Sequence, residues 1–390
     1  MTKSTNSPFC GNSFDNEWKF LCLCASPVTR DLKGFPISLY DFDWMMLLEL
    51  AEAHGMLGIL TARLKGINFA GVPTSFREEL QSRMRGQHLF SLGMTAELFR
   101  ILGDFAHSGI ESLLVKGPLM SLLAYNDPSV RSYGDLDLLV RHKQILAASQ
   151  RMIDSGFEPD VPLSVIVSGK VPGEYVFKRP GTKQIVELHT ERTLRYYPRP
   201  VPLESLFARQ RRVLMDGQQI PALRLEDEFV FHSVHGAKDF WERLMWVADI
   251  AAIVARHPEI DWSLLRKYAS DVGAERMVHV ALQLTQILLN VPLPQAMEDE
   301  VKRDTTAAQL CKQVIRWLPS AGYAPPELRE RAIFRMRMRG GHLAGAAYLL
   351  RLSFSPTEED WVEGHEENRS WFLDAVQRPL RLLRKYRSHG

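Results

Sequence analysis

The stretch Ser132-Tyr-Gly-Asp-Leu-Asp-Leu-Leu-Val140 places two carboxylates in a segment that otherwise reads as a buried strand. In a strand, residues i and i+2 point to the same face, so Asp135 and Asp137 are expected to project together. Two such charges repel, and each raises the pKa of the other unless a cation lies between them. Mg²⁺ is the simplest occupant, because it prefers carboxylate oxygens and commonly binds phosphate as well. The segment therefore favours metal-dependent phosphoryl or nucleotidyl transfer.

The competing interpretation is that Asp135 caps a helix beginning at about Leu136 and that Asp137 is solvated. The run Leu-Leu-Val that follows suits a buried strand, and helical spacing resumes only later, through Ile145, Ala148 and Met152. The strand is therefore the favoured interpretation.

The charge balance limits the classes of partner. The chain of 390 residues carries 48 basic and 46 acidic residues, a net charge of +2. This argues against a general nucleic-acid coat protein, although a local basic groove is compatible with it.

Four cysteines form no CxxC pair, and Cys22-x-Cys24 lies in an apolar patch, which indicates buried thiols and a reducing compartment. Apolar segments are too short for a signal core or a membrane span, so we expect a soluble, cytoplasmic protein.

Helical spacing dominates the first part of the chain. Residues 1–40 are weakly patterned, and we expect an irregular N-terminal arm with a short helix around Glu17–Cys24. Apolar residues then recur at 3.6-residue spacing and predict one helix from Asp41 to about Lys65, with Asp41 or Asp43 as the N-cap. A second helix is predicted over 75–108. Residues 41–108 are therefore expected to form an N-terminal helical region.

The pattern changes at residue 109 to alternating short strands and helices. A strand is predicted within 109–115, followed by the turn Lys116-Gly117-Pro118, a helix over 119–125, the acidic strand 135–140 and a helix over 141–155 that ends at Gly156. Two further strands, 174–178 and 184–189, flank the turn Arg179-Pro-Gly181. We predict an α+β core over 109–222 and a mainly helical domain over 223–390.

The last of these strands carries two more polar side chains. In Gln184-Ile-Val-Glu-Leu-His189, Glu187 and His189 share one face with Ile185. If this strand pairs beside 135–140, Glu187 becomes a third carboxylate at the same metal centre. The alternative for Glu187 is an ion pair on an edge strand. His189 is expected either to hydrogen-bond a carboxylate or to contact the substrate.

Several motifs occur together in a fixed order: Lys116-Gly117, Tyr125-x-Asp-Pro-x-x-Arg131, Asp135-x-Asp137 and Glu187-x-His189. This set resembles the nucleotidyltransferase superfamily of the DNA polymerase β type, and more closely the bacterial family of uncharacterised nucleotidyltransferases. Asp-x-Asp alone is a weak signal, whereas the ordered set is more specific. The resemblance covers most of residues 44–386, including a helical stretch with His235-Gly, Trp241-x-Arg-Leu-x-Trp246 and Asp249.

The resemblance implies a small mixed β-sheet with flanking helices, embedded between N-terminal and C-terminal helical regions. It implies an enzyme in which Asp135, Asp137 and Glu187 bind Mg²⁺ or Mn²⁺ and an NMP group passes from an NTP, most simply ATP, to an acceptor. Phosphate or nucleotide contacts are then expected from Lys116, Gly117, Arg131 and His189. The chain departs from the superfamily in one respect, since Lys-Gly-Pro stands where a Gly-Ser pair is usual.

The acceptor is left open: a small molecule, a sugar phosphate, a peptide or a protein side chain would all fit, and the balanced charge disfavours a polynucleotide. Kinase-like transfer of the γ-phosphate and a non-catalytic binding module of the same fold are the rival interpretations.

His232-x-x-His235 has zinc-ligand spacing but no convincing third ligand. His235, Arg243 and Asp249 are alternatively expected only to connect the helical domain to the core. The basic run 378–387 suggests a solvated helix face, or else a contact with anionic membrane or nucleic acid.

Overall fold

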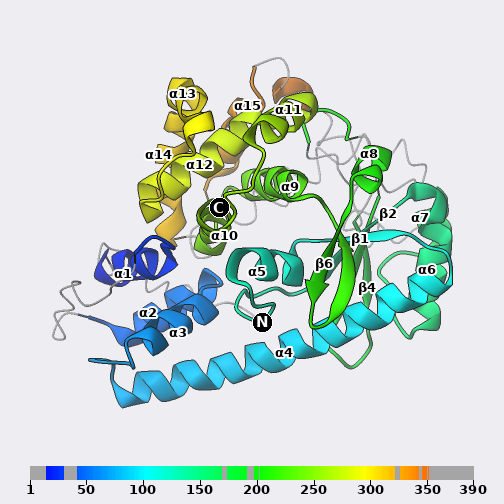
Figure 1. Ribbon diagram of the computed structural model, residues 1–390, viewed down its shortest axis with the longest axis horizontal. Helices are drawn as coiled ribbons and strands as arrows, with labels where there is room; N and C mark the ends of the chain where they lie inside the picture. The colour runs from blue at the N-terminus through cyan, green and yellow to red at the C-terminus, as the bar shows by residue number, and fades with distance from the viewer. Residues whose placement is uncertain are drawn as a thin grey trace.

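The computed structural model describes residues 15–29, 42–168, 174–190, 197–201, 203–320, 326–341, 345–348 and 350 (Figure 1). The basic run 378–387 lies outside these residues. Among the helices that are described, none combines the length and apolar character that crossing a membrane requires.

A mixed sheet forms the centre of the molecule. Among the described residues it has seven strands in the order β3-β4-β5-β2-β1-β7-β6. The pairs β2–β5 and β1–β7 are parallel, and the other neighbours are antiparallel. The strands are β1 (Ser112–Val115), β2 (Leu136–Val140), β3 (Glu158–Pro159), β4 (Glu174–Lys178), β5 (Ile185–His189), β6 (Arg211–Met215) and β7 (Gln218–Ala222). The α+β fold class expected from the sequence is confirmed.

Short helices accompany the strands along the chain. α5 (Gly117–Tyr125) follows β1, and its last turn ends at Asn126 in the left-handed conformation. The others are η1 (His142–Gln144), α6 (Ile145–Asp154), α7 (Leu163–Ser168) and α8 (Leu203–Ala208). Gly156, at φ +83°, follows α6 in the position expected for a helix-ending glycine.

In the described portion of residues 1–108 the helices are α1 (Asp15–Ala25), α2 (Trp44–Ala53), α3 (Leu57–Gly66) and α4 (Thr74–His107). In Figure 1 the long helix α4 runs along the lower side of the molecule, from α2 and α3 at one end to α6 beside the sheet at the other. The short helix expected around Glu17–Cys24 is confirmed as α1, and it is buried, since Phe20 and Leu21 are fully enclosed. Cys22 and Cys24 are buried thiols, as predicted.

The single helix expected over 41–65 is wrong, since α2 and α3 are separate helices. Asp43 caps α2 by accepting hydrogen bonds from the N–H groups of Met45 and Met46, as predicted. The break comes after Ala53, and Gly55 there has φ +70°. A left-handed residue cannot continue an α-helix, and the apolar periodicity simply resumes in α3.

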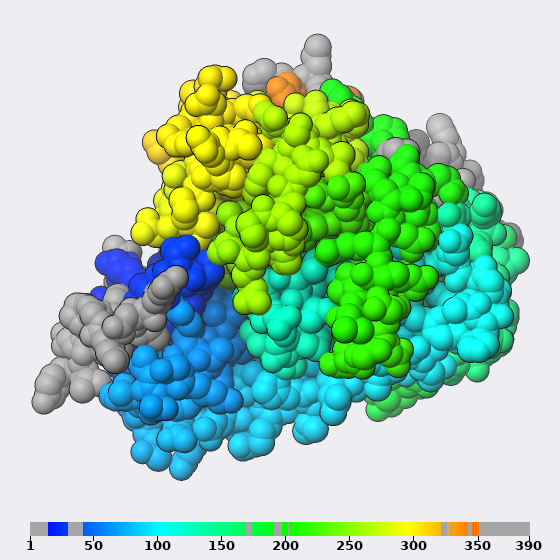
Figure 2. Space-filling view, viewed as in Figure 1, coloured from blue at the N-terminus to red at the C-terminus, as the bar shows by residue number. Residues whose placement is uncertain are grey.

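The C-terminal helices are α9 (Leu225–Lys238), α10 (Leu244–Arg256), α11 (Trp262–Val272), α12 (Glu275–Leu289), α13 (Gln295–Arg303), α14 (Thr305–Trp317), η3 (Leu318–Ser320) and α15 (Leu328–Arg337). α10 packs against α5 of the core, and α1 packs against both α10 and α12. Figure 2 shows these yellow-green and yellow helices lying directly on the blue N-terminal helices, with the green β6–β7 hairpin at the surface of this face. The described N-terminal helices and the C-terminal helices α10 and α12 therefore pack against one another beside the sheet.

Candidate functional site

Neighbouring strands bring the predicted acidic residues together. β2 and β5 run parallel, and their register places Asp137 directly beside Glu187. His189 follows Glu187 by two positions, so both side chains leave the same face of the sheet. The pairing that would make Glu187 a neighbour of the acidic strand is thus present.

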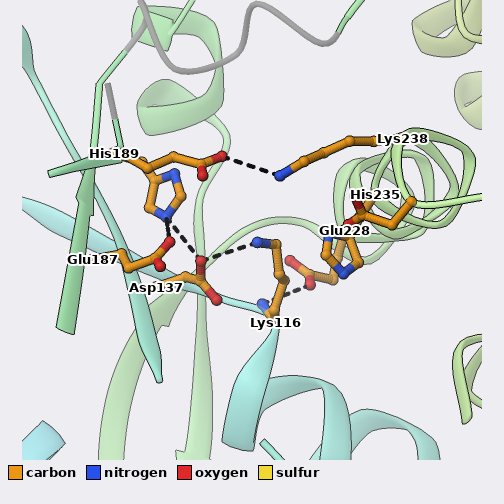
Figure 3. A network of polar contacts seen from close by, with 9 residues as sticks. Lys116, Asp137, Glu187, His189, Glu228, His235 and Lys238 are labelled. Carbon is orange, nitrogen blue, oxygen red and sulfur yellow. Dashed lines mark hydrogen bonds and ion pairs between the residues drawn. The ribbon is translucent and has the colours of Figure 1, made fainter. Parts of the chain in front are cut away.

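Asp137 is the centre of a buried polar network (Figure 3). Its Oδ1 accepts hydrogen bonds from Nε2 of His189 at 2.8 Å and from Nζ of Lys116 at 3.0 Å. The same His189 nitrogen lies 3.3 Å from Oε2 of Glu187. Asp137 and His189 are both buried. His189 therefore makes the carboxylate hydrogen bond that was one of its two expected roles.

The charges in this network stabilise one another. Burial penalises the charged form of Asp137, but Lys116 and His189 outweigh that penalty and hold the pKa of Asp137 well below its usual range. Burial also opposes the charge on His189, yet hydrogen bonds to Asp137 and Glu187 raise its pKa to about 9. At neutral pH the site therefore holds an anionic Asp137 between two cations.

Asp135 lies beside this group rather than within it. It immediately precedes β2 and is partly buried. Burial raises its pKa to about 7, and the charges of Asp137 and Glu187 add to the effect. Within the described parts of the chain, the cluster of potential metal ligands comprises Asp137, Glu187 and His189, whose ligand atoms lie within 4.8 Å of one another. The metal-ligand role of Asp135 stays a prediction.

The Lys116–Gly117 turn adjoins the network because β1 ends opposite Asp137: Val115 and Asp137 are partners in the antiparallel pair. Lys116 and Gly117 have φ angles of +51° and +40°. A lysine in this region is uncommon, and such backbone strain costs about 1–3 kcal/mol and is concentrated at functional sites. A Cβ added to Gly117 would come within 3.4 Å of the carbonyl oxygen of Asp135. Glycine therefore allows the turn and the acidic segment to approach.

Two residues of α9 also contact this region, although the sequence did not point to either of them: Glu228 and Lys238. The backbone N–H of Lys116 donates to Oε1 of Glu228 at 3.0 Å, and Glu228 is fully buried. Burial raises the pKa of Glu228 to about 7. Farther along α9, Nζ of Lys238 lies 3.4 Å from Oε1 of Glu174. The spacing of Glu228, His235 and Lys238 places them on one helix face, but only the tertiary structure turns that face toward the acidic strands.

Arg131 occupies a different environment from the one expected for a phosphate contact. Its Nε donates to Oδ2 of Asp249 at 2.7 Å, and the hydroxyl of Tyr125 donates to Oδ1 of Asp249 at 2.8 Å. The Arg131 and Asp249 side chains are almost fully enclosed. This geometry supports the alternative expectation for Asp249, a connection between the helical domain and the core. His232 belongs to the same link, with Nε2 3.4 Å from Asp249 Oδ2.

The carboxylates of Asp137 and Glu187 fit a divalent cation, whereas His189 must first lose the proton that it donates to Asp137 before its Nε2 can become a ligand. Carboxylate oxygens suit Mg²⁺ and Mn²⁺, and an imidazole nitrogen is tolerated better by Mn²⁺ than by Mg²⁺. Lys116 already compensates the charge of Asp137, so a bound cation and the Lys116 ammonium would compete for the same carboxylate.

Comparison with known proteins agrees with the resemblance noted in the motifs. The family described as "Uncharacterised nucleotidyltransferase" matches residues 40–290. Among solved structures, the chain is similar to an antigenic nucleotidyltransferase-like protein from Paracoccidioides brasiliensis at 15% identity and a TM-score of 0.29. That alignment covers 49% of this chain and 89% of the other. A search of curated proteins returned no match.

The family match begins just before α2 and ends just after α12, so it includes the whole described sheet, the Asp137 network and α9. It covers well over half of the chain. The protein therefore belongs to the family of uncharacterised nucleotidyltransferases.

Proposed function

We propose that this protein transfers an NMP group from an NTP, most simply ATP, to a hydroxyl or phosphate of an acceptor, with Mg²⁺ or Mn²⁺ as cofactor. The observation that carries the proposal is the register of β2 and β5, which sets Asp137 beside Glu187 next to the strained Lys116–Gly117 turn. Family membership supports a transferase activity.

Each side chain has a role in this proposal. Asp137 and Glu187 would hold the metal, with Asp135 as a further carboxylate at the start of the same strand. When bound, the divalent ion supplies charge that activates the acceptor and stabilises the triphosphate. His189 orients Asp137 and Glu187 through its shared Nε2 contacts.

Lys116 and Gly117 would form the phosphate side of the site. Lys116 supplies a compact positive charge, and Gly117 begins α5, where backbone N–H groups point toward a ligand. Pro118 has no N–H, so the turn offers fewer backbone donors than a Gly-Ser turn and relies more on the Lys116 ammonium.

The proposal is tested with ATP labelled at the α- or the γ-phosphate, a divalent cation and an acceptor pool from cell extract, read by mass spectrometry. We expect the α-label on an acceptor, and a loss of at least about 100-fold in Asp137→Asn, because even residues that only support metal ligands alter activity 10- to 100-fold. Asp271→Asn is the matched control, since Asp271 pairs with Lys267 on the surface of α11. Its transfer rate should equal that of the wild type.

One observation favours a second candidate. Lys116 and His189 neutralise Asp137 without a metal, which suits a binding module that keeps the fold but not the reaction. If no acceptor gains a nucleotide-sized mass and the protein binds no NTP, that second candidate replaces the first. Transfer of the γ-label instead of the α-label would establish kinase-like chemistry at the same residues.

A further inference from the structure

Lys116 is held in a backbone conformation that residues with side chains rarely adopt. Its φ of +51° and ψ of −142° lie close to a region that is readily open only to glycine. A residue persists there only where the surrounding contacts determine its position. Two of these contacts come from distant parts of the chain: the N–H of Lys116 donates to Glu228 of α9, and its ammonium donates to Asp137 of β2.

Glu228 holds the turn from the side of α9. Its carboxyl group is fully buried, and burial of such a group is costly unless it is hydrogen-bonded. Oε1 accepts the Lys116 N–H at 3.0 Å, whereas Oε2 has no hydrogen-bond partner among the residues that the structure describes. The energy of a hydrogen bond to a charged group is comparable to the strain of a residue in the conformation of Lys116. The contact with Glu228 is therefore strong enough to keep the turn in place.

The position of the turn decides where the Lys116 ammonium lies. Figure 3 shows the two contacts at opposite ends of Lys116, with the backbone N–H beside Glu228 and the ammonium beside Asp137. The ammonium lies 3.0 Å from Oδ1 of Asp137, and the lysine side chain is only 13% exposed. A divalent cation that binds Asp137 must displace this ammonium, because both bind the same carboxylate.

We propose that Glu228 is a positioning residue that regulates the access of the metal to Asp137. By holding the Lys116 N–H, it keeps the strained turn in the conformation in which the ammonium occupies Asp137 in place of a divalent cation. The metal competes with the ammonium, and α9 sets the strength of that competitor. The inference rests on the proposed function, since it concerns the metal site of that reaction.

Two variants of similar side-chain length separate this role from simple burial of a carboxylate. Glu228→Gln keeps an oxygen that can accept the Lys116 N–H, and Glu228→Met fills a similar volume without a comparable acceptor. Both remove the carboxylate charge, so a difference between them reports the hydrogen bond. Glu226→Met is the matched control, because Glu226 is buried two residues earlier on α9 and accepts the N–H of Asp261 at 3.1 Å.

The first measurement needs no metal. It follows the acetylation of Lys116 by acetic anhydride in the presence of EDTA, read by peptide mass spectrometry. Glu228→Met should react about fivefold or more faster than the wild type, because the rate follows the fraction of molecules in which the ammonium has left Asp137. Glu228→Gln and Glu226→Met should react at the wild-type rate. No acceleration in Glu228→Met, or the same acceleration in Glu228→Gln, overturns the positioning role.

The second measurement is the affinity for Mn²⁺, read from the electron paramagnetic resonance signal of the free ion. Glu228→Met should bind Mn²⁺ about fivefold or more tightly than Glu228→Gln, since Asp137 is released from the ammonium only in the methionine variant. The loss of a nearby negative charge alone would weaken Mn²⁺ binding equally in both. In a Lys116→Met background the competitor is absent, so Glu228→Met should bring no further gain. Equal affinities of Glu228→Met and Glu228→Gln overturn the competition.

The two measurements distinguish failure of this inference from failure of the proposed function. If no variant and no wild-type sample binds Mn²⁺, the proposed cofactor and the competition both fail, whereas faster acetylation in Glu228→Met alone still establishes that Glu228 positions Lys116. If Mn²⁺ binds and both measurements show no contrast, only the role of Glu228 fails. Thermal unfolding checks the fold of each variant, and Glu228→Ala, in which water can reach the N–H, replaces Glu228→Met if the latter is unfolded.

Discussion

Buried charged side chains in this protein are stabilised by hydrogen bonds to side chains of opposite charge. Asp137 stays ionised while buried because Lys116 and His189 share its Oδ1. Breaking a buried pair by removing one partner typically costs 3–5 kcal/mol, since the other charge remains uncompensated. The network can therefore persist without a metal, and a metal must compete with Lys116 for Asp137.

His54 shows the converse, a buried group that stays neutral. It is fully enclosed, and burial lowers its pKa to about 4 from 6.5. Its Nδ1 accepts a hydrogen bond from the backbone N–H of Leu244 at 3.2 Å, an acceptor position that protonation would remove. In the unfolded chain His54 binds a proton near pH 6.5, whereas in the folded protein it does so only near pH 4.

Stability should therefore fall as the pH drops from 7 to 4, because the unfolded state binds the proton first. His54 alone should contribute about 3 kcal/mol to this loss. In His54→Asn, whose amide oxygen can accept the same bond, the difference in unfolding free energy between pH 7 and pH 4 should shrink by that amount in urea titrations. The exposed His88→Asn should leave the difference unchanged; an equal effect of both variants would contradict the assignment.

At the residue scale, the sequence predicted the polar groups better than their partners. Alternation along residues 184–189 was enough to put Glu187 and His189 on one face, and the parallel pairing of β5 with β2 made them neighbours of Asp137. Arg131 could not be placed in the same way. Its buried partner Asp249 lies 118 positions farther along the chain, and no local spacing indicates so distant a contact.

At the scale of elements, the sequence predicts the long periodic helices, the strands around the acidic site and the β4–β5 hairpin, but not the break between α2 and α3 or the β6–β7 hairpin. The β6–β7 hairpin was missed although Asp216-Gly217, at φ +47° and +81°, has the composition and conformation of a two-residue hairpin turn. Its flanking strands alternate weakly, because Arg211 and Arg212 begin one and Gln218 and Gln219 begin the other. β7 takes its place by pairing with β1, and β6 takes its place by pairing with β7.

The packing of α3 on the loop before the acidic strand supplies a test at this scale. A Cβ added to Gly58 would lie 2.0 Å from the carbonyl oxygen of Val130, a backbone atom that cannot move aside cheaply. Gln87 of α4 donates to the same carbonyl at 3.2 Å and to that of Ser129 at 3.0 Å. Two helices thus fix the loop that leads to Arg131.

We expect Gly58→Ala to lower the unfolding free energy by about 2 kcal/mol or more, as overpacking does. Gly86→Ala is the matched control: Gly86 lies exposed on α4 with nothing within 4 Å of the added carbon. That substitution should raise stability by about 0.5–1 kcal/mol, because alanine favours helix more than glycine does. Changes of the same sign in the two variants, measured by urea denaturation, would argue against the close approach of α3 and the loop.

For the whole molecule, the question is what keeps the helices α9 and α10 in place over the sheet, since the site draws residues from α9 and from the strands. Asp249 of α10 receives hydrogen bonds from Arg131 and Tyr125 of the core. The loss of Asp249 leaves a buried guanidinium unpaired, and the loss of Arg131 leaves a buried carboxylate unpaired. Either loss lowers the free energy of unfolding strongly, and this penalty disappears when both side chains are removed.

We therefore expect Asp249→Ala and Arg131→Met each to destabilise the protein by about 3 kcal/mol or more. The double variant should lose less than the sum, with a coupling energy of at least about 1 kcal/mol in a double-mutant cycle. Lys267→Met with Asp271→Ala, an exposed pair 2.8 Å apart on α11, provides the reference and should couple by less than about 1 kcal/mol. Additive losses at Arg131 and Asp249 would mean that the two side chains act independently and that apolar packing of α10 on α5 alone positions α9 over the acidic strands.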